Sequence, residues 1–205
     1  MSNIKKQVTE ETARKVLEVV DKGLCQGMGK PEPGMMCVEA AVCYAMGEPH
    51  GDNPSCVGSA VRGFKIVLND ANWSSKEARA KGMRRVAIAQ LGSNKIDQKE
   101  FAEEVALQTI KQILPIALLA AAKMIPAHAG ALRACALACE LALDLPAAHA
   151  AADAAARAAD AEKDSVLSKA AEIAVKALIK LGCLGASYLW MTSTPGALTD
   201  FVGKA

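Results

Sequence analysis

Alanine is abundant in this sequence, while aromatic residues make up only 3% of the chain. Hydrophobic residues still account for 52% of its 205 residues, which is enough for a substantial core. Such a core has to be built from small and aliphatic side chains, which let helices approach one another closely, whereas sheets favour β-branched and aromatic residues. We therefore expect an all-α fold.

The positions of apolar residues, glycines and prolines predict one domain, residues 1–205, organised as a bundle of about six to eight helices. The expected helices cover residues 9–22, 35–46, 55–69, 75–91, 97–125, 129–143 and 147–181. Ser74 and Glu77 form a capping-box pattern at the start of the fourth helix, and Pro115 predicts a kink in the fifth. Residues 1–93 form a motif-bearing half, residues 97–191 an Ala-rich half and residues 192–205 a tail.

Eleven of the fifteen residues from Ala147 to Ala161 are alanine. The polar exceptions His149, Asp153, Arg157 and Asp160 are spaced by four, four and three residues, so they share one side of a helix. The rest of the circumference is almost all methyl groups, which allows close packing by neighbouring helices. We expect this long helix either to lie at the centre of the bundle or to mediate self-association. A partly exposed stretch of high helix propensity is the alternative.

Seven cysteines occur in the chain, without a CxxC pair or the spacing of a small secreted disulfide protein. The first twelve residues contain no apolar segment typical of a signal peptide. The most apolar run, Gln112–Ile125, is shorter than the ~20 residues that a membrane span needs, so we expect a buried helix there. These features predict a cytoplasmic protein with reduced thiols and no membrane partner.

The segment from Met35 to Val57 has the highest density of residues that can perform chemistry. Cys37 lies near the expected start of a helix, where backbone amides and the helix dipole favour a thiolate. His50 could act as its base, with Asp52 or Glu39 orienting the imidazole ring. This arrangement predicts a cysteine-dependent hydrolase or transferase. In the alternative reading, Cys37 is a small buried side chain and His50 belongs to a turn.

The same segment offers a weaker metal site. Glu39 and Cys43 share a helix face, and His50 and Cys56 could complete a shell of four ligands, although the spacing is not that of a zinc finger. A second group shares one helix face and resembles a core stripe, namely His128, Cys135 and Cys139. We expect no bound cofactor and no resident metal.

Positive charge is concentrated between Arg62 and Arg85, where seven basic residues face two acidic ones, while the whole chain carries a net charge of only +2. Phe64 and Trp73 lie in this window and could stack on a base. The pattern predicts a site for an anionic ligand or nucleic acid, with these candidate residues: Arg62, Lys65, Arg79, Arg84 and Arg85. The alternative is an amphipathic helix with a solvated basic face.

Three stretches of the first half, MCVEAAVCYAMGEPHGDNPSCV, LNDANWSS and RAKGMRRVAIAQLGS, precede the Ala-rich second half. Together they resemble a group of uncharacterised Ala-rich helical proteins from bacteria and bacteriophages. The resemblance implies no activity or site residue, although a bacteriophage connection would be compatible with a role in host interaction. We therefore expect a helical binding or assembly protein, with a protein partner, self-association or an anionic ligand.

Overall fold

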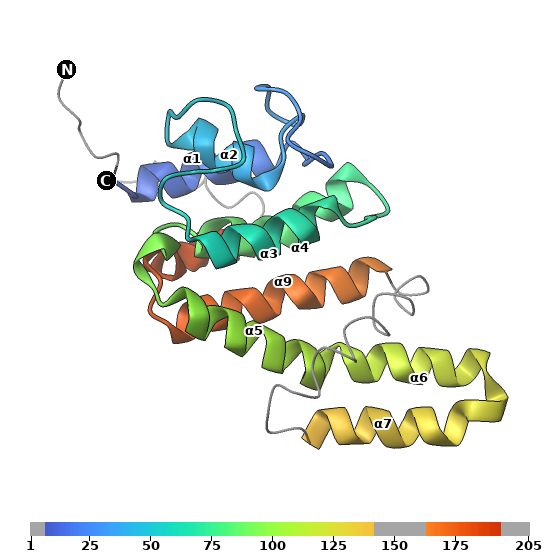
Figure 1. Cartoon of the computed structure of the whole chain (residues 1–205). Coiled ribbons are helices and arrows are strands. Elements are labelled where there is room, and N and C mark those ends of the chain that lie inside the picture. Colours follow the sequence, from blue (N-terminus) through green and yellow to red (C-terminus); the bar gives the residue numbers. More distant parts are fainter. Residues whose placement is uncertain (1–6, 142–162, 194–205) are drawn as a thin grey trace, which may run out of the picture.

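The computed structural model describes residues 7–141 and 163–193, and the regular secondary structure in these ranges is helical (Figure 1). Its α-helices are α1 (Glu10–Val20), α2 (Val38–Ala45), α3 (Ser59–Asp70), α4 (Lys76–Ala89), α5 (Gln98–Gln112), α6 (Leu114–Met124), α7 (Ala129–Leu141) and α9 (Lys163–Lys180). Three 3-10 helices accompany them, η1 (Ser93–Lys95), η2 (Pro126–His128) and η4 (Leu184–Thr192). The predicted all-α bundle is confirmed.

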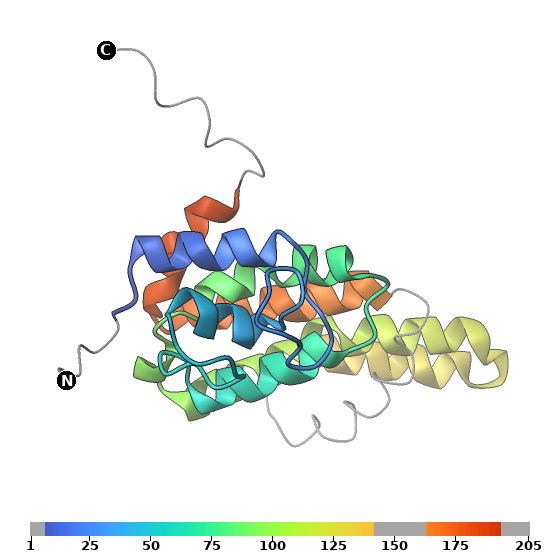
Figure 2. The same cartoon turned by 90° about the horizontal axis from the view of Figure 1, so that it is seen from above.

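Helix α4 lies in the middle of the body, between α1 and α2 on one side and α9 on the other (Figures 1 and 2). Its C-terminal half is completely buried from Val86 to Ala89. Opposite it, α9 buries a face formed by Ala174, Val175 and Leu178. Small side chains on both helices allow the close packing that the composition predicts.

The helix ends follow the predicted chemistry, with one correction. The Asp97 carboxylate accepts bonds from the first amides of α5, and Gly92 ends the α4 segment in the left-handed conformation (φ +82°). The N-cap of α4 is Ser75, whose hydroxyl accepts from Ala78 N, and not Ser74. Ser74 instead contacts Asp164, next to the start of α9.

The expected kink in the fifth helix is confirmed. Helix α5 ends at Gln112 and α6 begins at Leu114, with Pro115 in the first turn of α6, where its missing amide costs no helical bond. Helix α6 then stops before Pro126, as predicted.

Helices α6 and α7 form an antiparallel pair, the α6–α7 hairpin (Leu114–Leu141), which projects from the body in both views (Figures 1 and 2). Helix α6 is therefore only partly buried, which corrects the expected buried helix at Gln112–Ile125. By length and composition the stretch Gln98–Met124 could cross a membrane, and 39% of its most apolar window is buried. Its α5 half is part of the folded body, because Phe101 and Val105 lie in the core.

The expected core stripe on α7 is wrong, because His128 and Cys135 are exposed and Cys139 is half-buried. The expected helix over residues 147–181 is found from Lys163 onward as α9. Its Ala-rich part, Ala147–Ala161, lies outside the described residues, so its packing stays a prediction.

The contact between α4 and Trp73 generates a stability prediction. A Cβ atom added at Gly82 of α4 would overlap the buried Trp73 ring and lie 2.8 Å from Ser168 Oγ, whereas one added at Gly63 of α3 would meet open space. We expect Gly63→Ala to stabilise the protein by about 1 kcal/mol, because alanine is the better helix former. Gly82→Ala should destabilise it by about 1–3 kcal/mol through overpacking. Chemical denaturation of both variants measures the difference, and equal stabilisation by both would contradict this packing.

Candidate functional site

The loop before α2 is held over the C-terminal end of α3 by two neighbouring side chains. Asn69 Oδ1 accepts a hydrogen bond from Val38 N at 3.2 Å, and its Nδ2 donates to Cys25 O at 3.0 Å. Asp70 Oδ1 accepts from Gly27 N at 2.8 Å. Asn69 and Asp70 of the LNDANWSS stretch therefore position a Gly-rich loop.

Beneath this loop, α2 and α3 are joined by a buried ion pair. Lys65 Nζ lies 2.8 Å from Glu39 Oε1, and both side chains are completely inaccessible to solvent. Apart from this ion pair, neither carboxylate oxygen has a hydrogen-bond donor among the described residues. Burial raises the pKa of Glu39 and lowers that of Lys65, because it penalises both charges more than their attraction restores.

A cavity of about 30 Å³ borders this pair, with Cys37, Glu39, Asp52 and Asn69 among its lining residues. This volume accommodates one or two water molecules. Pockets for organic ligands are typically ~300–1,000 Å³, so the cavity is too small for a substrate. It is a small gap between the loop at Gly27 and Met28 and the helices α2 and α3.

Cys37 occupies the N-cap position of α2, which begins at Val38, three residues later than expected. Its Sγ accepts a hydrogen bond from Ala40 N at 3.3 Å, and the residue is only 5% exposed. Burial raises the pKa of the Cys37 thiol, and the bonds from the helix amides offset only part of this effect. The environment favours the thiol, whereas the predicted nucleophile requires the thiolate.

The other two residues of the predicted catalytic group have separate contacts. His50 Nε2 lies 3.2 Å from the carbonyl oxygen of Gly29, and Asp52 is exposed at the rim of the cavity. Among the described residues, none of the hydrogen bonds joins Cys37 to His50 or His50 to Asp52. The structure therefore shows a turn histidine that binds a neighbouring loop.

The predicted metal ligands are also separated by their partners. Glu39 is bound to Lys65, and His50 contacts Gly29. Cys43 and Cys56 are both buried, and burial raises the pKa of Cys43 to about 12. Within residues 7–141 and 163–193, no group of three or more His, Cys, Asp or Glu side chains is arranged to hold a metal ion.

Two of the five predicted anion-binding residues point inward. Lys65 binds Glu39 in the core, and Arg79 is 6% exposed. Arg79 Nε donates to Asn69 O at 2.8 Å and its Nη1 donates to Leu24 O at 3.0 Å. Lys65 and Arg79 are therefore buried and are not part of an exposed anion-binding surface.

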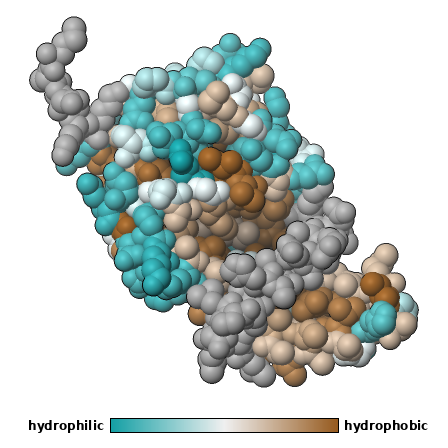
Figure 3. Space-filling view, in the orientation of Figure 1, coloured by the Kyte–Doolittle hydropathy of each residue, from teal (hydrophilic) through white to brown (hydrophobic). Residues whose placement is uncertain are grey.

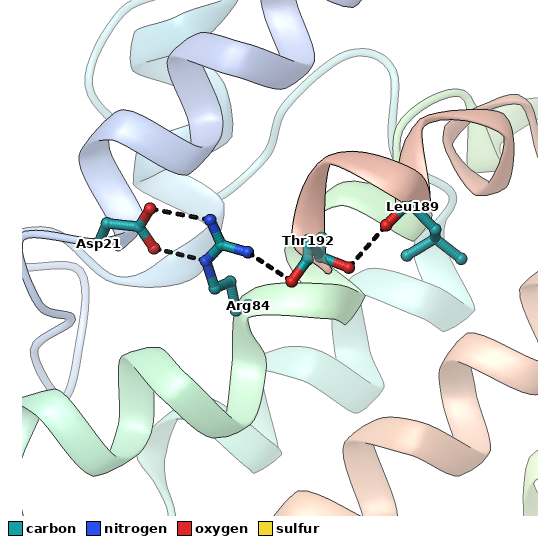
Figure 4. Close-up of polar contacts among 4 residues, drawn as sticks. All are labelled: Asp21, Arg84, Leu189 and Thr192. Carbon is teal, nitrogen blue, oxygen red and sulfur yellow. Dashed lines mark hydrogen bonds and ion pairs between the residues drawn. The ribbon is translucent and has the colours of Figure 1, made fainter. Parts of the chain in front are cut away.

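Arg84 joins three elements of the body (Figure 4). Its guanidinium donates to both carboxylate oxygens of Asp21, at 2.6 and 3.0 Å, and to the carbonyl oxygen of Thr192 at 3.0 Å. The Thr192 hydroxyl in turn donates to Leu189 O within η4. Arg85 extends this network, because its Nε lies 2.8 Å from Glu172 Oε1 of α9.

The remaining members of the predicted anion site do not form an open platform. Arg62 is half-buried on α3 and has no ion-pair partner among the described residues. Of the five predicted anion-binding residues, Arg62 alone is therefore left as a cation for a ligand. Trp73 is buried and donates from Nε1 to Leu68 O, while Phe64 packs edge-on against Phe101 with ring centroids 6.4 Å apart. Neither ring is available as a stacking surface for a base.

The surface of the α6–α7 hairpin was missed by reasoning from the sequence. Four of its large apolar side chains are exposed: Leu119 (42%), Met124 (82%), Ile125 (47%) and Leu137 (58%). Figure 3 shows mostly tan and brown surface over this projecting part. The sequence feature that could have indicated this surface is the scarcity of charge in α7, where Arg133 and Glu140 are the only charged residues.

The buried ion pair can be tested by replacing one or both partners. Lys65→Met should lower the free energy of unfolding by about 3–5 kcal/mol, because Glu39 is left buried without a counter-charge. The double replacement Glu39→Met and Lys65→Met should recover most of this loss, since no charge remains to desolvate. Lys81→Met at an exposed position of α4 is the control, expected within about 0.5 kcal/mol of the parent. A double variant as unstable as Lys65→Met would show that the core requires the charges.

The state of Cys37 predicts a pattern of alkylation. At pH 7.5 the exposed Cys135 should react first with iodoacetamide, while Cys37 should react only on unfolding, because it is buried and its pKa is raised. Mass spectrometry of timed digests measures the order. Rapid modification of the native protein at Cys37 that is lost in a His50→Ala variant would instead support the predicted cysteine-dependent hydrolase or transferase.

No protein-family model matches the chain, and comparisons with curated proteins and with solved structures find no match either. In the described part of the chain, Cys37, Glu39, Lys65, Arg79 and Arg84 are engaged by their own neighbours, whereas four large apolar side chains are exposed on the α6–α7 hairpin.

Proposed function

We propose that this chain is a helical binding or assembly protein that engages a protein partner through the α6–α7 hairpin. The observation that carries the proposal is the exposure of Leu119, Met124, Ile125 and Leu137 on an element that projects from the body. Isolated apolar side chains are common on protein surfaces, whereas several on one projecting element indicate an interaction site.

The chemistry of the first half supports this choice among the possible functions. Its buried carboxylate and ammonium neutralise each other, and burial disfavours the Cys37 thiolate. Arg84 and Arg85 bind acidic residues of the same chain, which leaves them less available to a phosphate. These interactions stabilise the body, so the hairpin surface is the stronger candidate for binding.

The construction of the hairpin supports it as well. Helix α7 packs on α6, with some contact to α5, and Ala136 is the one residue of Ala129–Glu140 that is fully buried. Most of the circumference of α7 therefore faces solvent. A helix with so little charge is expected to be covered on more than one side.

Site-specific photo-crosslinking tests this function. A benzoyl-phenylalanine group placed at Met124 or Leu137 should form adducts with protein in the cells from which the gene comes. The same group at Val67, a 74% exposed position on α3, is the matched control and should form few. Aspartate at the untagged hairpin position should abolish the adducts while changing stability by about 0.5 kcal/mol or less, since both residues are exposed. Equal yields at Met124, Leu137 and Val67 would contradict the proposal.

A further inference from the structure

The side of α7 opposite α6 is an uncovered strip of small residues. Gly130, Ala134, Leu137 and Ala138 are all exposed and project within about 100° of one another around the helix. A Cβ atom added at Gly130 would meet nothing within 4 Å. The buried Ala136 points to the other side, toward α6. We call this strip the outer face of α7.

Two opposite charges border the outer face along one edge. Arg133 and Glu140 are seven residues apart, so they lie on the same side of the helix but about 10.5 Å apart along its axis. This separation is too large for them to pair with each other. Both are exposed, and neither has an ion-pair partner among the described residues.

Resting on the proposed function, we propose that the partner of the outer face is a second copy of this chain, packed antiparallel on α7. The two copies are related by a two-fold axis that is perpendicular to both α7 helices and passes at the height of the midpoint between Ala136 and Leu137. This axis places Arg133 opposite the partner's Glu140, and Glu140 opposite the partner's Arg133. The axis also keeps the charged edges of both helices on the same side of the interface. Both charges of each copy are thereby paired.

The spacing of the charges and the size of the side chains favour an antiparallel second copy over a parallel copy or a bilayer. A parallel pair in register would place the two charged edges on opposite sides of the interface, so Arg133 would not meet the partner's Glu140 and both charges would stay unpaired. Small residues at Gly130, Ala134 and Ala138 allow two helices to approach closely, with Leu137 near the axis filling the centre. A bilayer would gain little from such a strip, because burial of apolar area drives insertion and these side chains offer few methylene groups.

The interface should be weak. Helix α7 has 13 residues and is therefore about 20 Å long, so its outer face is smaller than the ~800 Å² per partner of a typical stable complex. We expect a dissociation constant on the order of 10 μM for the dimer.

Charge reversal tests the geometry on the full chain by sedimentation velocity. R133E and E140R should each raise the dissociation constant about tenfold, because each creates two like-charge contacts. An equimolar mixture of the two variants should associate as well as the parent, since every contact between the unlike copies is again attractive. The double variant R133E/E140R should likewise recover association. K123E, on the exposed end of α6, changes the charge equally outside the face and should leave association unchanged.

Several outcomes would overturn the second copy as the occupant. A parent chain that stays monomeric at about 1 mM, or a mixture of R133E and E140R that does not associate, would do so. Lower melting temperatures of variants that remain monomeric would show that the face is covered within its own chain. Loss of binding to phosphatidylserine vesicles in R133E, with a monomeric parent, would assign the face to a membrane. Photo-adducts with another protein at Leu137, together with a monomeric parent, would show that only the homodimer is wrong. Absence of both self-association and photo-adducts would overturn the proposed function as well.

Discussion

Close packing around α4 is the constraint on which the rest of the body depends. Helix α4 can be surrounded because its buried side chains are small or aliphatic, and because Gly82 leaves room for the Trp73 ring. Its long polar side chains form bonds to neighbouring elements. Arg79 binds the backbone at Asn69 and Leu24, and Arg84 binds Asp21 and the end of η4. Each guanidinium thus satisfies carbonyl or carboxylate groups at the ends of neighbouring elements, where helical bonds are missing.

The Glu39–Lys65 pair plays a different part, because it orients α2 on α3 although the cost of burying both charges offsets their attraction. Two charges in the core lose most of their hydration, which offsets much of their mutual attraction. A pair of apolar side chains would bind α2 to α3 with less positional selectivity, since apolar contact is not directional. Alternative registers of α2 on α3 would leave a charge unpaired, so the ion pair disfavours them.

The sequence was informative about local geometry and poor in information about burial. Proline and glycine restrict the backbone wherever they occur, so the break at Pro115 and the helix stop at Gly92 could be predicted. Lys65 could not be placed, because it occurs among other basic residues and its partner Glu39 is 26 positions earlier in the sequence. Cys37 was assigned a reactive role from the helix amides and dipole and from His50 nearby in the sequence, whereas the dominant effect on its pKa is burial, which depends on the packed fold. The stripe of His128, Cys135 and Cys139 was taken as core because exposure, too, depends on the packed fold.

The body and the α6–α7 hairpin therefore obey different physical requirements. In the body, buried polar side chains such as Asn69, Arg79 and Ser93 are bonded to neighbouring elements, so substitutions there act on the fold. Helix α6 is anchored by Leu114, Pro115 and Ala117, whereas α7 has α6 as its main support. A helix of this length is marginal in water and relies on tertiary contacts. A partner on the outer face would give α7 a second apolar contact without disturbing the packing around α4, so binding could vary independently of the stability of the body.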